Sequence, residues 1–437
     1  MSTSSGRDGH PGPSATNERL AGAVARVVRN GNCSGCGACA LVSSRVSLDL
    51  DEDGFLRPSV AADCAVDAAT DRREARLFRR TCPGDRLAAP RDPRPHDSAT
   101  FGRYVQAWEA WAADPEVRFA GSSAGALTAL STWLVESGRA PSVVGAASDA
   151  ERPARTVPVR ITSRQEALAA AGSRYAPVGT VAGYDPSGPA PLVGKPCEVS
   201  AARQLNEALG VPDAASPIRL TFFCAGTPSQ RATESLAAAL GVPADQAVSL
   251  RYRGNGWPGE FRVVGRDGTA GAASYEESWG RHLGRNLQWR CKICPDGTGG
   301  DGDISVGDFW RADENGYPVF DDADGSSVVI ARTERGRALV EAAIAAGVLV
   351  ARPVSLDAVE AIQPLQRTRR ETLLGRLAGR LAAGRRIPRY RGYGLLALAA
   401  RHLSANLRAA RGTRKRSLAP RRTEGAADAV ARVRADS

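Results

Sequence analysis

The sequence lacks long apolar runs. No apolar stretch approaches the roughly 20 residues that a membrane-spanning helix needs. Residues 1–17 are rich in Ser, Gly and Pro, which predicts a disordered N-terminus without the basic-then-apolar pattern of a secretion signal. We therefore expect a cytoplasmic protein.

Histidine is scarce, and its placement narrows the kinds of metal site to be expected. None of the four histidines lies beside a cysteine pattern: His10, His96, His282 and His402. The nine cysteines are odd in number and several are separated by only two residues, which in a reducing compartment favours metal ligation over disulfides. Any metal site is expected to use sulfur alone.

The net charge of +11 is unevenly distributed. Residues 367–437 hold 19 Lys and Arg against 4 Asp and Glu, so the rest of the chain is slightly acidic. A general nucleic-acid-binding role is not expected, because the basic field belongs to one terminal segment. Leucines at helical spacing among the arginines predict a helical basic tail. This tail either contacts an anionic surface, such as membrane lipid or an acidic partner, or is a solvated extension.

Three cysteines near the N-terminus are spaced as in an iron-sulfur loop. Cys33-Ser-Gly-Cys36-Gly-Ala-Cys39 lets three thiolates reach three corners of a cubane, with glycines that allow the backbone to wrap closely. Ser43 stands where a ferredoxin run would place its fourth cysteine, so Cys82, followed by proline, is the candidate fourth ligand. The alternative is a zinc site built from the same sulfurs.

A second set of cysteines lies in the other half of the chain. Cys291 and Cys294 form one chelating pair, and Cys197 and Cys224 are available as its partners. Spacing alone leaves open a cluster, a zinc site, or a role for Cys224 as a buried core thiol. Cys64 has no patterned neighbour and is interpreted as a free cysteine.

From residue 101 the pattern is that of an α/β protein. Gly121-Ser-Ser-Ala-Gly125 is expected to open a helix, with Ser122 or Ser123 as its N-cap and Gly138 beyond its end. Strands are predicted at 142–146, 157–161, 218–224 and 327–332, and a further helix at 333–346. The 121–125 loop suits a pyrophosphate, although a packed helix entrance is the common alternative.

Several ordered motifs together resemble one family. It comprises the beta subunits of coenzyme F420-reducing hydrogenases and dehydrogenases and includes the 7-hydroxymethyl chlorophyll a reductases. Besides the N-terminal cysteine loop, the matching stretches are Arg118 to Gly125, Gly172 to Tyr175, Gly194 to Cys197, Phe223 to Gly226, Arg251 to Trp257, and Cys291 to Asp308.

The resemblance implies an oxidoreductase that carries FAD and [4Fe-4S] clusters, which we expect to be two in number. Its flavin would exchange hydride with coenzyme F420 or a similar partner and pass electrons singly to the clusters. Carried over by position, FAD would be held by Arg118, Gly121, Ser122, Ser123, Gly125, Ser173, Arg174 and Tyr175. The second cluster would be held by Cys197, Cys224, Cys291 and Cys294. No catalytic residue is assigned.

The expected fold is α+β or mixed α/β, in five parts. They are a disordered N-terminus (1–17), a ferredoxin-like [4Fe-4S] region (18–98), a flavin-binding part (99–190), a C-terminal domain with the second cysteine set (191–363), and the basic helical tail (364–437). Two departures from the family are Ala124, where glycine is usual, and the tail, which resembles the subset found among bacterial polysaccharide genes.

Two other functions remain open. One is an electron-transfer subunit without its own substrate, which serves a polysaccharide-biosynthesis or other reductase partner. The other is a zinc-stabilised binding protein. In either redox case the partner would be a protein or a small-molecule electron donor or acceptor.

Overall fold

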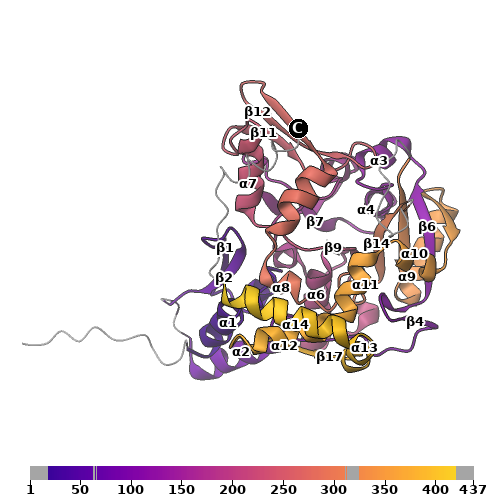
Figure 1. Ribbon diagram of the computed structural model, residues 1–437. Coiled ribbons are helices and arrows are strands. Elements are labelled where there is room, and N and C mark those ends of the chain that lie inside the picture. Colours follow the sequence, from indigo (N-terminus) through magenta and orange to yellow (C-terminus); the bar gives the residue numbers. More distant parts are fainter. Residues whose placement is uncertain (1–17, 63, 65, 311, 313–323, 420–437) are drawn as a thin grey trace, which may run out of the picture.

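The computed structural model describes residues 18–62, 64, 66–310, 312 and 324–419, and its central element is an eight-stranded mixed sheet (Figure 1). The predicted disorder of residues 1–17 therefore lies outside the described residues. In spatial order the strands are β16 (Leu349–Pro353), β6 (Gln106–Ala112), β15 (Ser326–Ala331), β14 (Ile304–Phe309), β10 (Arg219–Phe222), β9 (Leu192–Gly194), β7 (Val143–Ser148) and β8 (Thr156–Ile161).

The four strands β14, β10, β9 and β7 pair in parallel, and the remaining strands pair in antiparallel fashion. This arrangement confirms the mixed α/β class. Parallel strands bring their carboxyl ends to one edge of a sheet, where ligands commonly bind. The ferredoxin-like and flavin-binding assignments stay predictions.

Helices cover both faces of the sheet because neighbouring strand residues point to opposite sides. Val143 packs with α4 (Ala126–Glu136) and α9 (Glu334–Ala345), whereas Val144 packs with α6 (Pro196–Leu209). Shorter helices complete the layers: α3 (Pro115–Ala120), α5 (Arg164–Ala169) and α10 (Leu356–Ala361). The predicted strands and the helix at 333–346 are thus present within a few residues.

The N-terminal region is a small unit of two helices and a hairpin. Its elements are α1 (Glu18–Arg29), β1 (Val46–Leu50), β2 (Leu56–Val60), α2 (Ala68–Thr81) and β3 (Arg86–Ala88), and the hairpin of β4 (His96–Ser98) and β5 (Gly102–Tyr104) leads to the large sheet. Leu20, Val24 and Phe78 pack around Cys33, so the first cysteine loop lies against an apolar core.

A three-stranded antiparallel sheet forms a separate lobe. It consists of β11 (Ala247–Arg251), β12 (Glu260–Gly265) and β13 (Ala270–Ser274), with α7 (Gln230–Ala239) and the π-helix η4 (Glu276–His282) beside it. Phe261, Tyr252 and Leu236 are fully or almost fully buried in its core.

The C-terminal segment is helical within its described residues, as predicted, but it is not a tail outside the body. Over residues 364–418 it packs on the body as α11 (Pro364–Glu371), α12 (Leu373–Leu381), α13 (Leu395–Arg401) and α14 (Leu403–Leu418), and β17 (Arg389–Arg391) pairs with β3 (Figure 1). Leu373 and Leu377 are buried against Ile293, in the second cysteine loop. Arginine side chains in this segment bind carbonyls of the body, so the segment is an integral layer.

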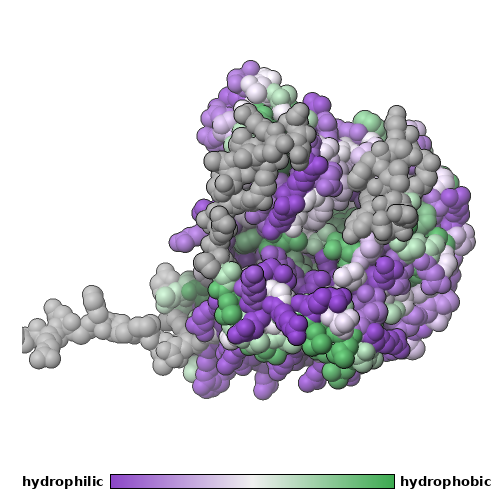
Figure 2. Space-filling view, in the orientation of Figure 1, coloured by the Kyte–Doolittle hydropathy of each residue, from purple (hydrophilic) through white to green (hydrophobic). Residues whose placement is uncertain are grey.

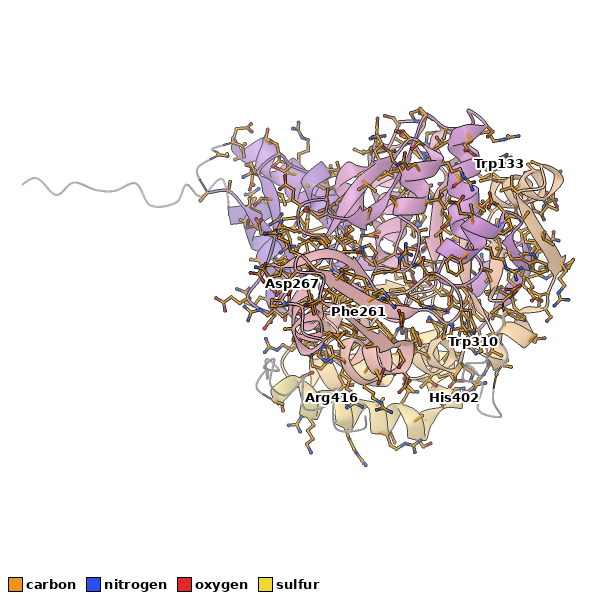
Figure 3. All side chains as sticks on the ribbon, turned by 90° about the horizontal axis from the view of Figure 1, so that it is seen from above. Trp133, Phe261, Asp267, Trp310, His402 and Arg416 are labelled. Carbon is orange, nitrogen blue, oxygen red and sulfur yellow. The ribbon has the colours of Figure 1, made fainter. Side chains whose placement is uncertain are left out.

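Helix α14 has its polar residues inside. Asn406 and Thr413 are buried against α12, where Gly375 allows close approach because a Cβ there would lie 2.2 Å from the Asn406 carbonyl oxygen. Leu403 and Leu407 face solvent instead, with exposed fractions of 61% and 52%. In Figure 3, His402 and Arg416 mark this helix at the outer edge of the molecule. Within the described residues, no helix has the length and apolar character needed to span a bilayer.

Candidate redox site

The first cysteine set converges as the spacing predicts. The loop with Cys33, Cys36 and Cys39 follows α1, and Cys82 is the C-cap residue of α2, which packs against α1. All four sulfur-bearing residues line one small cavity, together with apolar side chains such as Phe78.

Backbone amides point at these sulfurs. The Gly35 N–H donates to Cys33 Sγ at 3.4 Å. The loop wraps tightly: Gly37 has φ of 88°, and a Cβ there would lie 2.5 Å from the Gly179 carbonyl oxygen. Burial raises the pKa of Cys36 to about 11, so a thiolate at this position requires a nearby cationic centre.

The second cysteine set gathers at the carboxyl edge of the parallel strands. Strands β9 and β10 are hydrogen-bonded neighbours, with Gly194 paired to Thr221. Cys197 and Cys224 therefore follow the ends of adjacent strands, although they are far apart in sequence. Burial is the largest cause that raises the pKa of Cys224, to about 12, and the sulfur of Cys291 adds to it.

The chelating pair is tied to the same place. Cys291 lies in α8 (Trp289–Lys292), and the loop with Cys294 follows it. The Cys224 N–H donates to the Gly297 carbonyl at 2.8 Å, and the Thr227 N–H donates to Cys291 Sγ at 3.2 Å. N–H···S bonds of this kind accompany iron-sulfur clusters and tune their potentials.

The two cysteine sets are neighbours. Gln288 in the second region donates to the Ser34 carbonyl at 3.0 Å and accepts from Arg57 at 2.9 Å. The field of Cys36 also reaches Cys197 and helps to raise its pKa, after burial as the main cause. The loops that carry the two cysteine sets are therefore in contact.

Among the described residues, no three His, Cys, Asp or Glu side chains are close enough together to hold one metal ion. A four-iron cluster spreads its thiolates more widely, because each sulfur binds its own iron. None of the nine cysteines, all of which are described residues, forms a disulfide, and Cys64 is the exposed one among them.

A large cavity of about 810 Å³ adjoins the second set. Its volume is within the range of ligand and cofactor sites. Its wall contains these predicted residues, together with Cys224: Gly121, Ser122, Ser123, Gly125, Ser173, Arg174 and Tyr175. Figure 2 shows a hollow with apolar residues between the β11–β12 lobe and the more hydrophilic C-terminal helices.

The 121–125 loop differs in detail from the prediction. The N-cap of α4 is Gly125, with φ of 70° and no side-chain cap, whereas Ser123 donates to the Ser326 carbonyl at 2.6 Å. Either serine as N-cap is therefore wrong. Without such a cap, the first-turn N–H groups of α4 remain available to an anion. Ala124 is fully buried and not part of the cavity wall.

The two arginines assigned to the pyrophosphate are engaged elsewhere. Arg118 donates to the Gly325 carbonyl at 3.0 Å and is not part of the cavity wall. Arg174 is part of the wall, but its guanidinium donates to Thr156 at 2.8 Å and to the Arg155 carbonyl at 3.1 Å. Their role toward FAD remains a prediction.

Other cavity residues escaped the sequence analysis. Arg253 is 3% exposed, contacts the Asp308 carboxylate at 2.5 Å, and lies 4.8 Å from the Trp257 ring centroid. Burial opposes its charge, but Asp308 outweighs this and raises the pKa of Arg253. Lys195 and Glu198 form a buried pair in the same wall. In the sequence, Lys195 and Glu198 appear only as two opposite charges on either side of Cys197, and this pattern is too common to indicate a site.

The C-terminal helices cover the second set. Arg369 donates to the carbonyls of Cys224 and Ala225 at 2.7 and 2.6 Å. Arg370 donates to the Pro295 carbonyl at 2.8 Å, and Arg376 donates to the Lys292 carbonyl at 3.3 Å. These contacts hold both cysteine loops in place.

The fold and site define a mixed α/β protein with two buried cysteine sets, the second beside a cofactor-sized cavity. Sequence profiles for the beta subunit of coenzyme F420 hydrogenase/dehydrogenase match residues 107–182 (N-terminal part) and 191–356 (C-terminal part). The chain belongs to this family, which supports an oxidoreductase role.

Two known proteins illustrate the likeness. The coenzyme F420 hydrogenase subunit beta of Methanococcus voltae is 27% identical over 260 residues, which cover 57% of this chain and 84% of that protein. A chain of the xenon-derivatised F420-reducing [NiFe] hydrogenase complex from Methanosarcina barkeri is 22% identical, with a TM-score of 0.46. The match covers 62% of this chain and 94% of that one.

Proposed function

We propose that this chain is an iron-sulfur flavoprotein oxidoreductase. FAD occupies the 810 Å³ cavity, and a [4Fe-4S] cluster is held at each cysteine set. The observation that supports this most is that Cys224 and the 121–125 loop share one cavity wall. A cluster on that sulfur would lie close to the flavin.

Different residues of the chain bind the flavin and the two clusters. A bound flavin supplies two-electron hydride exchange and one-electron release, which the clusters alone do not. The N-terminus of α4 binds the anionic pyrophosphate with its backbone N–H groups. Aromatic side chains such as Trp257 and Phe223 line the cavity and exclude water. Cys197, Cys224, Cys291 and Cys294 fix the nearer cluster, and Cys33, Cys36, Cys39 and Cys82 the farther one.

The proposed substrate is coenzyme F420 or a similar hydride donor or acceptor. We expect the anaerobically purified chain to turn over reduced F420 with an artificial electron acceptor. No turnover by protein that retains its flavin would rule out this substrate and favour a second candidate, an electron-transfer subunit. The name of the M. voltae relative, a hydrogenase subunit, favours that candidate.

We also propose a surface role for α13 and α14. Leu396, Leu403 and Leu407 are exposed by 78%, 61% and 52%, and arginines surround them. Residues 372–423 contain no Asp or Glu, so this face suits an anionic lipid surface. Cosedimentation with anionic vesicles tests this, and an acidic protein partner is the competing outcome.

A further inference from the structure

Arg290 is a buried arginine that has no carboxylate partner among the residues that the structure describes. It precedes Cys291 in α8 and is 2% exposed. Within the described residues its guanidinium makes one hydrogen bond, from Nη2 to the Pro83 carbonyl at 3.3 Å. Its Nε and Nη1 atoms are buried without a hydrogen-bond partner.

Several other buried arginines are compensated more fully, although Arg380, which is also 2% exposed, likewise keeps its Nε without a hydrogen-bond partner among the described residues. Arg45 pairs with Asp71 at 2.8 Å, and Arg219 pairs with Asp213 at 3.1 Å. Arg332 has no carboxylate contact within the described part of the chain, but it donates to several oxygens, among them the carbonyls of Phe101 and Thr298, both at 2.7 Å. A buried guanidinium is costly unless an anion or a full set of acceptors compensates it.

The groups around Arg290 indicate the missing anion. Its guanidinium lies 5.5 Å from the Tyr390 ring centroid, and the sulfurs of Cys294, Cys197 and Cys291 exert the other favourable fields on it. Tyr390 lies in β17 and anchors the cysteine loop by donating to the Ile293 carbonyl at 2.9 Å. The Pro83 carbonyl, in turn, follows Cys82 of the first set.

We propose that Arg290 is a positioning residue that supplies a buried positive charge to the second cysteine set, in addition to Lys195 beside Cys197 and Arg369 on the Cys224 carbonyl. This rests on the proposed function, in which four thiolates and iron form an anionic cluster there. Reduction adds one negative charge, so a nearby guanidinium stabilises the reduced form and raises the reduction potential. The Pro83 contact holds the same charge against the first set.

The test is an EPR-monitored redox titration of the anaerobic holoprotein, with iron and sulfide measured in every variant. The signal of the second cluster is the one that Cys224→Ser removes. We expect Arg290→Met to disfavour its reduction at least tenfold, a shift of about 59 mV for one electron. Arg290→Lys keeps the charge and shifts the potential less. The control Arg219→Met, at the opposite end of β10 from Cys224, does not shift it.

The outcomes separate the alternatives. Loss of the second cluster in Arg290→Met but not in Arg290→Lys also supports a role for the charge. Three results would overturn the inference about Arg290 but leave the proposed function intact. They are an unchanged reduction potential in Arg290→Met, a shift equal to that of Arg219→Met, and equal loss of the cluster in both Arg290 variants. A wild-type protein with only one cluster would refute the proposed function as well.

Discussion

The buried pair of Lys195 and Glu198 lies in the cavity wall beside Cys197. Lys195 Nζ contacts Glu198 Oε1 at 2.7 Å and the Val178 carbonyl at 3.0 Å. Glu198 also accepts the backbone N–H groups of Lys195 and Thr180, at 2.7 and 3.1 Å. The side chains are 8% and 1% exposed. The Glu198 carboxylate is therefore held by the Lys195 ammonium group and by two backbone N–H groups.

Lys195→Met leaves the Glu198 carboxylate buried without its cation. Breaking a buried pair on one side costs about 3–5 kcal/mol. Removing both charges, in Lys195→Met with Glu198→Gln, is expected to cost less than the sum of the single changes by about 1–3 kcal/mol. Anaerobic urea unfolding of the holoprotein, followed by tryptophan fluorescence, measures these differences.

The pH dependence gives a second check. Burial lowers the pKa of Lys195, but Glu198 and Cys197 outweigh this, so the pKa is raised above its ordinary 10.5. A raised lysine pKa gives stability that is fully present below the unfolded pKa and is lost as pH rises through the folded one. The deficit of Lys195→Met should thus be constant between about pH 7 and 9. In the unfolding experiment, the pair would be refuted if the losses of unfolding free energy in Lys195→Met and Glu198→Gln simply added up in the double variant.

Three further predictions concern the cofactors and the surface. Cys36→Ser should lose the first cluster and Cys224→Ser the second, each removing about half of the bound iron. Gly125→Ala should weaken FAD binding about tenfold, since a Cβ would lie 2.4 Å from the Val117 carbonyl oxygen and forced backbone strain costs about 1–3 kcal/mol. Changing both Leu403 and Leu407 to Gln should reduce binding to anionic vesicles about tenfold.

Each of these predictions has a matched comparison. Cys64→Ser should leave the iron content unchanged, and equal loss from Cys64→Ser and Cys36→Ser would contradict the assignment. Gly138 follows the same helix with φ of 69° and has nothing within 4 Å of a Cβ, so Gly138→Ala controls for backbone strain without contact. For the surface, binding to a protein partner but not to vesicles would contradict the lipid proposal.

The first cysteine set was predictable because its information is local. Three cysteines within one loop fix their own separation, and the proline after Cys82 marked that residue as the candidate for the fourth position in the same cavity wall. The second set required tertiary information. Cys197 and Cys224 meet only because β9 and β10 pair in parallel, and no spacing in the sequence shows that pairing.

The role of the C-terminal segment could not be inferred from charge. Its arginines were expected to face either an anionic surface or water, yet Arg369 and Arg370 bind backbone carbonyls of the cysteine loops. The sequence does not distinguish an arginine that donates several hydrogen bonds inside the protein from an arginine that is exposed to water. The prediction that Ser122 or Ser123 caps α4 was wrong for a related reason, because the Ser123 hydroxyl donates to the carbonyl of Ser326 in β15 instead.

Cofactor analysis of anaerobically purified protein tests the central claim most directly. The account predicts about eight iron and eight acid-labile sulfide per chain, one FAD, and visible absorbance from both cofactors. Colourless protein that carries stoichiometric zinc and no flavin would contradict it.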